Sequence, residues 1–394
     1  MTRSSYVFDI DSHFEPGPDW LDAYPDLKAR LPPPDIARLA VDSIVGDILR
    51  GVPESERPPH ADLVPPGAAI LFGREKEAEA ERRAAFEGKD QRQTADAAAR
   101  VEWLDVQGID VQNVICLEGR GQTVGIDDLG LVHEVLGLCN EWLADTCDEA
   151  GERLLPVTTL AFEDLDWALL ELRRMRARGS RIALVSAAPI GGKALCHPDL
   201  DPLWKTITDL GMIGMFHVGF GPASFDPGWA NTGGDTTLLR LIGSSHRHQA
   251  PQVALSSMIY GGVFERHPTL TMTLAEVGIG WLPWFYHDCD DRVTPSTELF
   301  LGKWTLPMRP SEYLARNVKG TPLSWGTDQP LPQIMQSLPD EMVVFSSDFP
   351  HFEGYVDPMG YYATQLKQCS EARLETFFGG AMREAFARMG DPLD

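Results

Sequence analysis

Four ionisable side chains alternate with other residues near the start of the chain, in the segment DIDSHFEP. They are Asp9, Asp11, His13 and Glu15. Strict alternation is the period of a β-strand, so a strand here would project all four side chains from one face. Three carboxylates beside an imidazole repel one another unless a cation neutralises them. The segment therefore suggests a metal site, although a polar edge strand that faces water would show the same alternation.

Further metal-binding side chains stand at the ends of other apolar segments. His217 follows the run MIGMF, and Glu276 follows TLTMTLA. Asp348 and, just beyond it, His351 follow the run EMVVFSS. If these segments are parallel strands of a barrel, their carboxyl ends meet at the edge where barrel enzymes place catalytic groups. A mixed set of nitrogen and oxygen ligands suits zinc, iron or manganese better than magnesium or calcium.

The elements that would position these side chains alternate between strand and helix after residue 100. Most expected strands are followed by an amphipathic helix, which is the pattern of a parallel sheet. Eight such units predict a (β/α)8 TIM barrel, with an open doubly wound sheet as the alternative. No GxGxxG follows a strand, which argues against dinucleotide binding. The eight expected strands are SSYVFDID, DVQNVICLEG, RLLPVTTLAF, RIALVSAAP, MIGMFHVG, TLTMTLAE, KGTPLSWG and EMVVFSSDFP.

Residues 21–99 interrupt this repeat after the first strand. They are rich in proline, as in RLPPPD and GVPESERPPHADLVPPG, and then run into the charged stretch GREKEAEAERRAAFEGKDQRQ. Loops after barrel strands line the mouth of the active site. We therefore expect one barrel over residues 1–394, with the inserted Pro-rich and helical segment 21–99 as a lid or a dimer arm. A solvated decoration is the alternative.

Composition restricts the classes of partner. The chain has 394 residues, 43% of them hydrophobic, and a formal net charge of −24. Such a charge disfavours binding to nucleic acid or to an anionic membrane and favours a small-molecule substrate. No run of eighteen apolar residues and no signal-peptide pattern is present, and the six cysteines show no CxxC spacing. These features predict a cytoplasmic protein with reduced thiols.

Several stretches together resemble the amidohydrolase superfamily, specifically the amidohydrolase-related branch. That branch includes aminocarboxymuconate-semialdehyde and resorcylate decarboxylases and metal-dependent thioesterases. The similar stretches span most of the chain, and their combination is more specific than any one of them. They are DIDSHFEP, VEWLDVQGID, HPDLDPLW, GGVFERHPTLTMTLAEVGIGWLPW, PSEYLARN and VVFSSDFPHFEG. The resemblance implies a metal-dependent (β/α)8 barrel.

The resemblance also implies roles for particular residues. The family's first-strand motif, a ligand and a histidine separated by one residue, corresponds to Asp11 and His13. Its fifth-strand histidine corresponds to His217. Its eighth-strand aspartate, which also handles the proton of the metal-bound water, corresponds to Asp348. Glu276 stands at the sixth-strand position, where the decarboxylases often carry histidine.

Two departures from the family pattern make the expected site more acidic. One is Glu276, and the other is Asp11, which stands where hydrolases of the superfamily commonly have histidine. With His13, His217 and Asp348 they would bind one or two divalent ions, with iron or manganese favoured over a single zinc ion. Glu276 would be a ligand or an acid/base; the alternative is that it only hydrogen-bonds a metal-bound water or a ligand histidine.

Four further residues are candidates for the site. His287 lies on the expected helix GIGWLPWFYHDCDD and would be an acid/base or a second-metal ligand, with a surface position as the alternative. His351 is a candidate acid/base on the last loop of the catalytic side. Arg120, in CLEGRGQ, is placed to meet an anionic substrate, and Trp20 is a pocket wall or a packing residue.

The leading interpretation is a metal-dependent hydrolase of an amide, ester or thioester. In this scheme a metal-activated water attacks a carbonyl, and Asp348 takes and returns its proton. An acyl-CoA thioester of secondary metabolism is one candidate substrate. The alternative within the family is non-oxidative decarboxylation of an aromatic or unsaturated acid. A non-catalytic binding barrel ranks below both. We expect the protein to form a homodimer.

Overall fold

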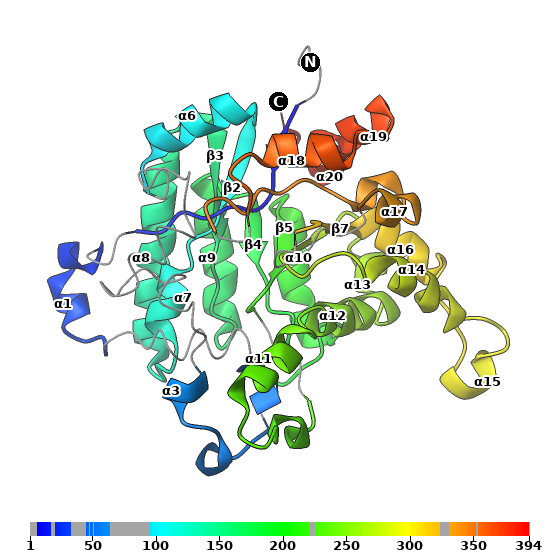
Figure 1. The fold of residues 1–394 in the computed structure, drawn as a ribbon, viewed down its shortest axis with the longest axis horizontal. Coiled ribbons are helices and arrows are strands. Elements are labelled where there is room, and N and C mark those ends of the chain that lie inside the picture. Colours follow the sequence, from blue (N-terminus) through cyan, green and yellow to red (C-terminus); the bar gives the residue numbers. More distant parts are fainter. Residues whose placement is uncertain are drawn as a thin grey trace.

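Seven parallel strands form a curled sheet at the centre of the molecule (Figure 1). The computed structural model describes residues 6–16, 20–32, 45–46, 48–49, 51–63, 95–220, 225–323, 331–351 and 354–393. Strand order follows chain order, and each strand pairs in parallel with the next. The strands are β1 (Phe8–Asp9), β2 (Val111–Val114), β3 (Leu154–Thr158), β4 (Ile182–Leu184), β5 (Ile213–His217), β6 (Met272–Ala275) and β7 (Val318–Gly320).

The segment 343–349 takes the place of the expected eighth strand. It follows the short helix η8 (Asp340–Met342) and makes only a single bridge, from Val343 to Gly320 of β7. Its backbone nevertheless bonds on both sides: the Val344 N–H donates to the Gly320 carbonyl at 3.0 Å, and the Phe345 carbonyl accepts from Ile10 at 3.4 Å. The segment thereby joins β7 to the chain after β1 and closes the (β/α)8 ring.

The eighth segment is irregular for a local reason. The Ser347 N–H donates to the Asp9 carboxylate at 2.9 Å instead of to a neighbouring backbone carbonyl. One residue later, Asp348 has φ of 51°, which a regular strand does not allow. The segment has strong β-propensity, but it leaves the regular hydrogen-bond pattern of the sheet where it meets the ionisable N-terminal segment.

Helices pack around the sheet as the periodicity predicted (Figure 1). Five of the long helices start with an aspartate cap that accepts a hydrogen bond from a backbone N–H of the first turn: Asp96, Asp128, Asp164, Asp235 and Asp357. The long helices are α6 (Ala97–Gln107), α8 (Leu129–Asp148), α9 (Leu165–Ala177), α10 (Asp201–Asp209), α11 (Thr236–Ser244), α12 (Gln249–Tyr260), α14 (Leu282–Asp291), α16 (Pro310–Asn317), α18 (Pro358–Gln365) and α20 (Ala381–Arg388).

Shorter helices complete the described chain. They are η1 (Trp20–Ala23), α1 (Pro25–Lys28), η2 (Glu54–Glu56), α3 (His60–Leu63), α7 (Glu118–Thr123), η5 (Gly151–Arg153), η6 (Pro198–Leu200), η7 (Pro227–Ala230), α13 (Val263–Arg266), α15 (Glu298–Leu301), α17 (Leu331–Gln336), α19 (Glu371–Glu375) and η9 (Thr376–Gly380). The sequence patterns did not indicate α7, which carries Arg120, or α11, which follows β5 and its His217. No helix in the described ranges is long and apolar enough to cross a bilayer.

The core has an inner and an outer part. The inner cluster joins strand residues such as Phe8, Val157 and Met215 to α20, whose Phe386 meets Phe8 with ring centroids 5.6 Å apart. The outer cluster fills the layer between strands and helices. Because α20 packs against one end of the barrel interior, the opposite end, where the strands finish, is left to the ionisable groups.

Two described parts of the inserted segment 21–99 pack in different places. Leu21 and Leu27 are buried against Leu131 of α8, whereas the described residues between 45 and 63 pack against the chain between β5 and α12. Val45, Leu49 and Leu63 are buried in one cluster with Leu239 of α11. Arg240 also donates from Nη1 to the Asp62 carbonyl at 3.2 Å. This contact places part of the insertion beside a segment that follows the carboxyl end of β5. The charged run at 73–93 lies outside the described residues, so the lid or dimer-arm role stays a prediction.

Candidate metal centre

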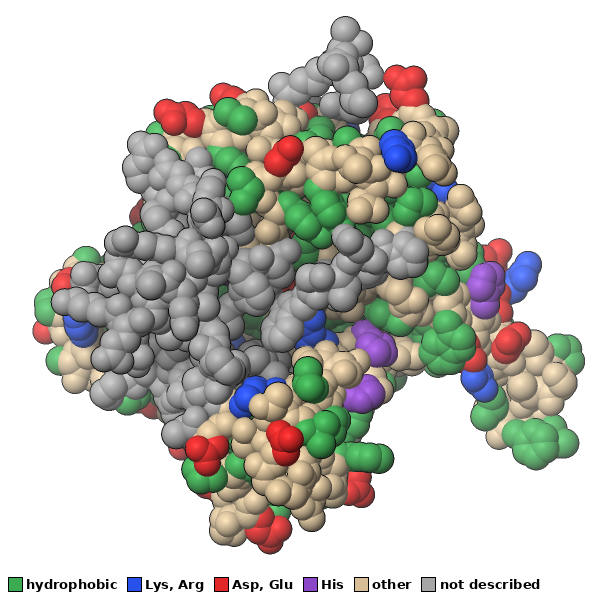
Figure 2. All heavy atoms as spheres, in the orientation of Figure 1, with side chains coloured by type: hydrophobic (Ala, Val, Ile, Leu, Met, Phe, Trp, Pro, Cys, Tyr) green, Lys and Arg blue, Asp and Glu red, His purple; other side chains and the backbone are tan. Residues whose placement is uncertain are grey.

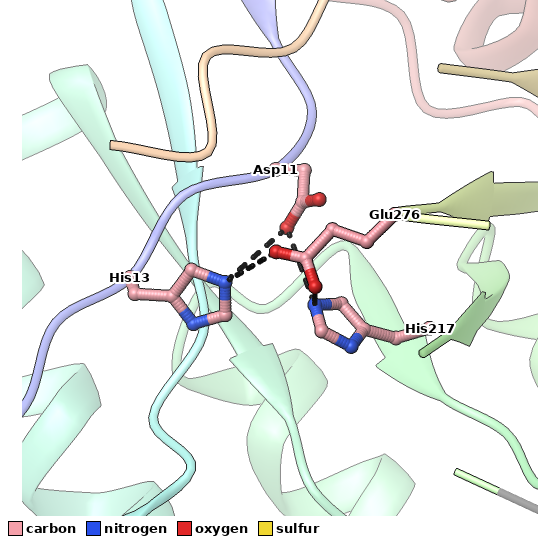
Figure 3. Close-up of side chains that lie close together, drawn as sticks. All are labelled: Asp11, His13, His217 and Glu276. Carbon is pink, nitrogen blue, oxygen red and sulfur yellow. Dashed lines mark ion pairs between the residues drawn. The ribbon is translucent and has the colours of Figure 1, made fainter. Parts of the chain in front are cut away.

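Four ligand-type side chains converge where β5, β6 and the N-terminal segment finish (Figure 3). His217 Nε2 lies 3.7 Å from Asp11 Oδ1 and 3.6 Å from Glu276 Oε2. His13 Nε2 lies 3.8 Å from Asp11 Oδ1 and 3.5 Å from Glu276 Oε1. All four residues are buried. The Glu276 carboxylate therefore lies between the two imidazoles, with one oxygen toward each.

The unsatisfied atoms of this cluster fit a metal ion. Both ring nitrogens of His13, Nε2 of His217 and Oε1 of Glu276 are buried and have no hydrogen-bond partner in the described structure. His217 Nδ1 meets the Val218 carbonyl at 2.8 Å, which assigns the ring proton to Nδ1 and leaves the Nε2 lone pair for a metal. Ligands that each sit about 2.1 Å from a shared ion are about 3–4 Å apart, and the observed separations have this size.

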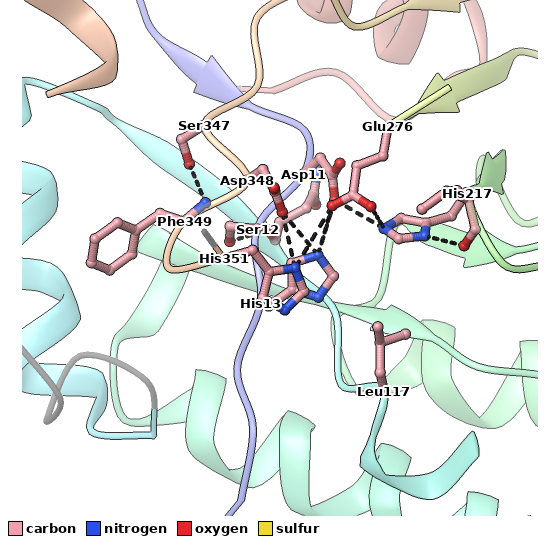
Figure 4. A network of polar contacts seen from close by, with 12 residues as sticks. Asp11, Ser12, His13, Leu117, His217, Glu276, Ser347, Asp348, Phe349 and His351 are labelled. Atoms are coloured by element: carbon pink, nitrogen blue, oxygen red, sulfur yellow. Dashed lines mark hydrogen bonds and ion pairs between the residues drawn. The ribbon is translucent and has the colours of Figure 1, made fainter. Parts of the chain in front are cut away.

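Asp348 and His351 extend the cluster from the loop after the eighth segment (Figure 4). Asp348 Oδ1 lies 3.3 Å from His13 Nε2 and 3.2 Å from His351 Nδ1. The His351 ring stacks on the His13 ring with centroids 3.6 Å apart. His13 and Glu276 belong to both groups of possible ligands, so the arrangement has room for one ion or for two adjacent ions.

Two of these side chains sit on unusual backbone. Glu276 has φ of 57° and Asp348 has φ of 51°, in the left-handed region that residues other than glycine seldom occupy. Such a conformation costs of order 1–3 kcal/mol and persists only where the surroundings enforce it. In both cases the left-handed residue directly ends a strand-like segment and turns its carboxylate toward His13.

Burial and charge shift the pKa values in opposite directions within the cluster. Burial, then the neighbouring His351, lowers the pKa of His13 well below its usual value. Burial alone would raise the pKa of Glu276, but His217, His13 and His351 outweigh it and bring the pKa well below the usual range. Burial would lower the pKa of His351, but Asp348 and Glu276 raise it well above normal. These shifts favour a neutral His13, a charged Glu276 carboxylate and a protonated His351.

Only two of the four alternating N-terminal side chains enter the cluster. Asp9 instead accepts hydrogen bonds from the Ser347 N–H at 2.9 Å and from Gln112 Nε2 at 2.8 Å. Glu15 accepts from the backbone N–H groups of Leu117 and Glu118 at 3.1 Å and so caps the start of α7. The expectation that all four would share one face is wrong, because β1 ends at Asp9 and the alternation does not continue as a strand.

A buried arginine that the sequence analysis did not identify supports the cluster. Arg100 of α6 donates from Nη2 to the His13 carbonyl and from Nη1 to Gln112 Oε1, both at 2.7 Å. Its guanidinium lies between the rings of Phe14 and Phe349, 4.5 and 4.8 Å from their centroids. The helical period could have revealed the burial of Arg100, because position 100 falls on the same face as the buried Ala97, Trp103 and Leu104.

Arg120 lies on α7, close to the metal-binding cluster. Its guanidinium is half-buried and sits 5.6 Å from the centre of the Phe220 ring. Phe220 in turn meets His217 edge to face, with centroids 5.9 Å apart. Burial lowers the pKa of Arg120, and the charge of Glu163 acts in the opposite direction. A cation held this close to the cluster fits the predicted contact with an anionic substrate.

Neither His287 nor Trp20 belongs to the ligand cluster. His287 is exposed and contacts Tyr286, because α14 buries Leu282, Phe285 and Cys289 and position 287 falls on the opposite side. The structure does not bring it to the cluster. Trp20 belongs to η1 and packs against a cluster that includes Leu131 of α8. Its indole Nε1 is buried with no hydrogen-bond partner in the described chain.

A closed barrel of parallel strands with metal-binding side chains at the carboxyl ends of the strands is typical of metal-dependent barrel enzymes. The sequence matches the amidohydrolase family over residues 10–386, so the chain belongs to that family. The resemblance found in the sequence and the (β/α)8 prediction are thereby confirmed.

Particular relatives extend the comparison. A 2-amino-3-carboxymuconate-6-semialdehyde decarboxylase from Dictyostelium discoideum is 23% identical over 245 residues, which are 61% of this chain and 63% of that protein. The amidohydrolase map2389c from Mycobacterium avium subsp. paratuberculosis K-10 has a similar structure, with a TM-score of 0.65, 20% identity and coverage of 97% and 99% of the two chains. A 5-carboxyvanillate decarboxylase from Novosphingobium aromaticivorans DSM 12444 with bound manganese has a TM-score of 0.66, 16% identity and coverage of 98% and 97%.

Proposed function

We propose that the protein is a metal-dependent, non-oxidative decarboxylase of an aromatic or unsaturated carboxylic acid. One observation carries the proposal. In this member of the family, the ligand cluster lies beside Asp348 and His351, an ion pair that can supply a proton. Support comes from the similarity to decarboxylases in both sequence and fold. We expected hydrolysis first, because Glu276 replaces the histidine common in decarboxylases; the relatives favour the alternative.

The proposed division of roles follows the positions of the side chains. Asp11, His13, His217 and Glu276 would hold the ion, with Asp348 at its edge. A bound divalent ion would supply Lewis-acid attraction for the carboxylate and a neighbouring oxygen of the substrate. Manganese is the first ion to test, since a protein of similar fold binds it.

The proton would come from the pair formed by Asp348 and His351, whose Oδ1 and Nδ1 atoms lie 3.2 Å apart. His351 is partly open to solvent, whereas Asp348 is fully buried. The pair can therefore carry a proton between solvent and the interior. In the reaction a proton adds to the carbon that bears the carboxylate, and a π electron pair of the substrate forms the new C–H bond. The carbon–carbon bond to the carboxylate then breaks, its electron pair restores the π system, and carbon dioxide leaves. Arg120 would hold a second anionic group of the substrate.

Hydrolysis of a carbonyl C–X bond is the second candidate, because the chain belongs to the amidohydrolase family and Asp348 could equally take the proton of a water. The two reactions differ in their products. The purified protein, loaded separately with manganese, zinc and iron, should be incubated with hydroxybenzoates and unsaturated dicarboxylates labelled with 13C at the carboxylate. Labelled carbon dioxide and incorporation of solvent deuterium at the former carboxylate carbon are the expected results.

A parallel panel of amides, esters and thioesters tests the second candidate. Turnover of that panel without carbon dioxide release would overturn the decarboxylase proposal in favour of hydrolysis. Asp348→Asn is the control for background chemistry, since it should abolish either reaction. Turnover of neither panel by protein that has bound a full equivalent of metal would count against both candidates.

A further inference from the structure

Two buried thiols are in contact next to the start of α7. The Sγ atoms of Cys116 and Cys139 lie 3.0 Å apart, and each residue is only 2% exposed. Cys116 lies in the segment between β2 and α7, whereas Cys139 lies on α8. The sulfur atoms of a disulfide are about 2.05 Å apart, so these two have to approach by only about 1 Å to form one.

The hydrogen bonds around the two thiols run in one direction. The Cys116 S–H donates to Glu15 Oε2 at 3.8 Å, which leaves the Cys139 S–H to donate to the Cys116 sulfur. The Glu15 side chain is 32% exposed, so it extends from the buried thiols to solvent. Its carboxylate can therefore accept the Cys116 proton and also hydrogen-bond a small polar oxidant beside the sulfur.

Size and charge restrict the oxidant. Both thiols are buried, so a bulky disulfide compound cannot reach either sulfur atom. Acidic side chains occur on several sides of the surface in view (Figure 2), and the net charge of −24 repels anionic compounds such as glutathione disulfide. Hydrogen peroxide is uncharged and little larger than water. A peroxide is therefore the oxidant that fits this place.

The Cys116 thiol keeps its proton at neutral pH. Burial, followed by the hydrogen bond with Cys139, raises the pKa of Cys116 well above its usual value. The thiolate is the reactive form of cysteine, so the proton has to leave as the sulfur reacts. Glu15 is in position to accept it. We therefore expect oxidation to be slower than at an exposed thiolate.

We propose that Cys116 and Cys139 are an oxidation site for hydrogen peroxide, where a reversible disulfide anchors the start of α7 to α8. First, the Cys116 sulfur attacks one peroxide oxygen, the O–O bond breaks, and the thiol proton passes through Glu15 to the departing hydroxide, which leaves as water. Next, the Cys139 sulfur attacks the sulfenic acid of Cys116, the S–O bond breaks, and hydroxide leaves with the Cys139 proton as a second water. The two sulfur atoms together lose two electrons, and the peroxide gains them.

The packing of α7 on α8 transmits the new bond. A Cβ added at Gly119 would lie 2.9 Å from Cys139 Cβ, which is closer than side chains approach, so glycine allows this contact. A disulfide would close the loop of residues 116–139 and restrict the opening of α7 away from α8. α7 carries Arg120, so an effect on substrate binding rests on the proposed function, whereas the disulfide itself does not.

Mass spectrometry of the full-length protein tests this proposal. The protein is loaded with zinc, which has no redox chemistry, and is then treated with hydrogen peroxide, alkylated under denaturing conditions and digested. We expect a crosslink between the peptides of Cys116 and Cys139 that dithiothreitol removes. Amide hydrogen exchange over residues 118–123 should slow about threefold or more in the oxidised protein, and exchange in α20 should not change.

Two variants separate the outcomes. In Cys139→Ala the reaction should stop at the sulfenic acid of Cys116, which dimedone labels. Cys369→Ala removes a half-buried thiol outside the pair and should form the crosslink as the parent does. A parent protein that gives no crosslink between Cys116 and Cys139 would overturn the proposal, whether or not the variants fold. A crosslink without slower exchange in residues 118–123 would refute the anchoring of α7.

Discussion

Arg100 Nη2 donates a hydrogen bond of 2.7 Å to the backbone carbonyl of His13, 87 residues earlier in the chain. The same guanidinium bonds Gln112, which bonds Asp9, so one buried cation links the first two strands of the barrel behind the metal-binding cluster. Burial lowers the pKa of Arg100 to about 9, and burial raises the pKa of Asp9 to about 6. The position of His13 therefore depends on a charged group that does not itself face the site.

Replacement of Arg100 tests this dependence. Arg100→Met removes the buried cation and leaves the His13 carbonyl without its donor, and breaking a buried network of this kind costs about 3–5 kcal/mol. We expect a fall in the thermal midpoint and in the affinity for manganese, measured by calorimetry. Arg309→Met, at an exposed position, is the control and should change neither quantity. Unchanged metal affinity in Arg100→Met would show that His13 holds its place without this contact.

Glu276 offers a test of the ligand set. Glu276→Gln keeps the shape of the side chain but removes the negative charge that lies between His13 and His217. If Glu276 is a ligand, the purified variant will contain about one equivalent less metal than the parent, as measured by plasma emission spectroscopy. Full metal content with reduced activity would instead assign it to acid/base chemistry or to positioning. Full activity would remove it from the site.

His351 should matter for proton transfer more than for metal binding. His351→Asn removes the partner of Asp348 without touching Asp11 or His217. Loss of a positioned acid typically lowers kcat by about 10²–10⁴-fold. We expect a loss in this range with metal content retained, measured by steady-state kinetics beside metal analysis. His197→Asn, on an exposed turn, is the control.

Arg120 should act on substrate binding. Arg120→Met removes the half-buried cation beside Phe220 while keeping a side chain of similar length. For a substrate with two anionic groups we expect KM to rise about 10- to 100-fold with kcat changed by less than about threefold, since charge-assisted bonds contribute about 1.5–3 kcal/mol. Initial-rate kinetics separate the two constants. An equal fall in kcat at unchanged KM would place Arg120 in the chemical step instead.

Lys319 predicts a pH-dependent stability. Its side chain on β7 is fully buried, its ammonium meets the Ala315 carbonyl at 3.3 Å, and burial followed by Arg388 lowers its pKa from 10.5 to about 8. Between pH 8 and 10.5 the folded protein binds fewer protons at this site than the unfolded chain, so the free energy of unfolding should rise with pH there by up to about 3 kcal/mol.

The matched variant isolates this contribution. Lys319→Met should raise the free energy of unfolding at pH 7 by about 1–3 kcal/mol, because it removes a buried charge and keeps the volume. It should also lack the increase between pH 8 and 10.5 in urea titrations. Lys205→Met, at an exposed position, should reproduce the parent profile. A parent and a Lys319→Met variant with the same pH profile would show that the buried amine costs nothing.

Local patterns were sufficient to predict the barrel. Strand and helix periods, with ligand-type residues at strand ends, follow from interactions between residues a few positions apart, and these are written directly in the sequence. They gave the order of strands and brought Asp11, His13, His217, Glu276 and Asp348 to one end of the sheet. They overestimated the regularity of the eighth segment, because the bond from Ser347 to Asp9 joins residues 338 apart.

Tertiary contacts decided which candidates share the site. Asp9 and Asp11 have the same side chain and equivalent places in the alternation, yet contacts from Ser347 and Gln112 take Asp9 away from the cluster. His287 has the right chemistry, but the buried face of α14 turns it outward. Arg100 supports the site by its hydrogen bond to the backbone carbonyl of His13, which is far away in the chain. Residue type and local period fix what a side chain can do, whereas contacts between distant segments fix where it points, and only the folded chain brings those segments together.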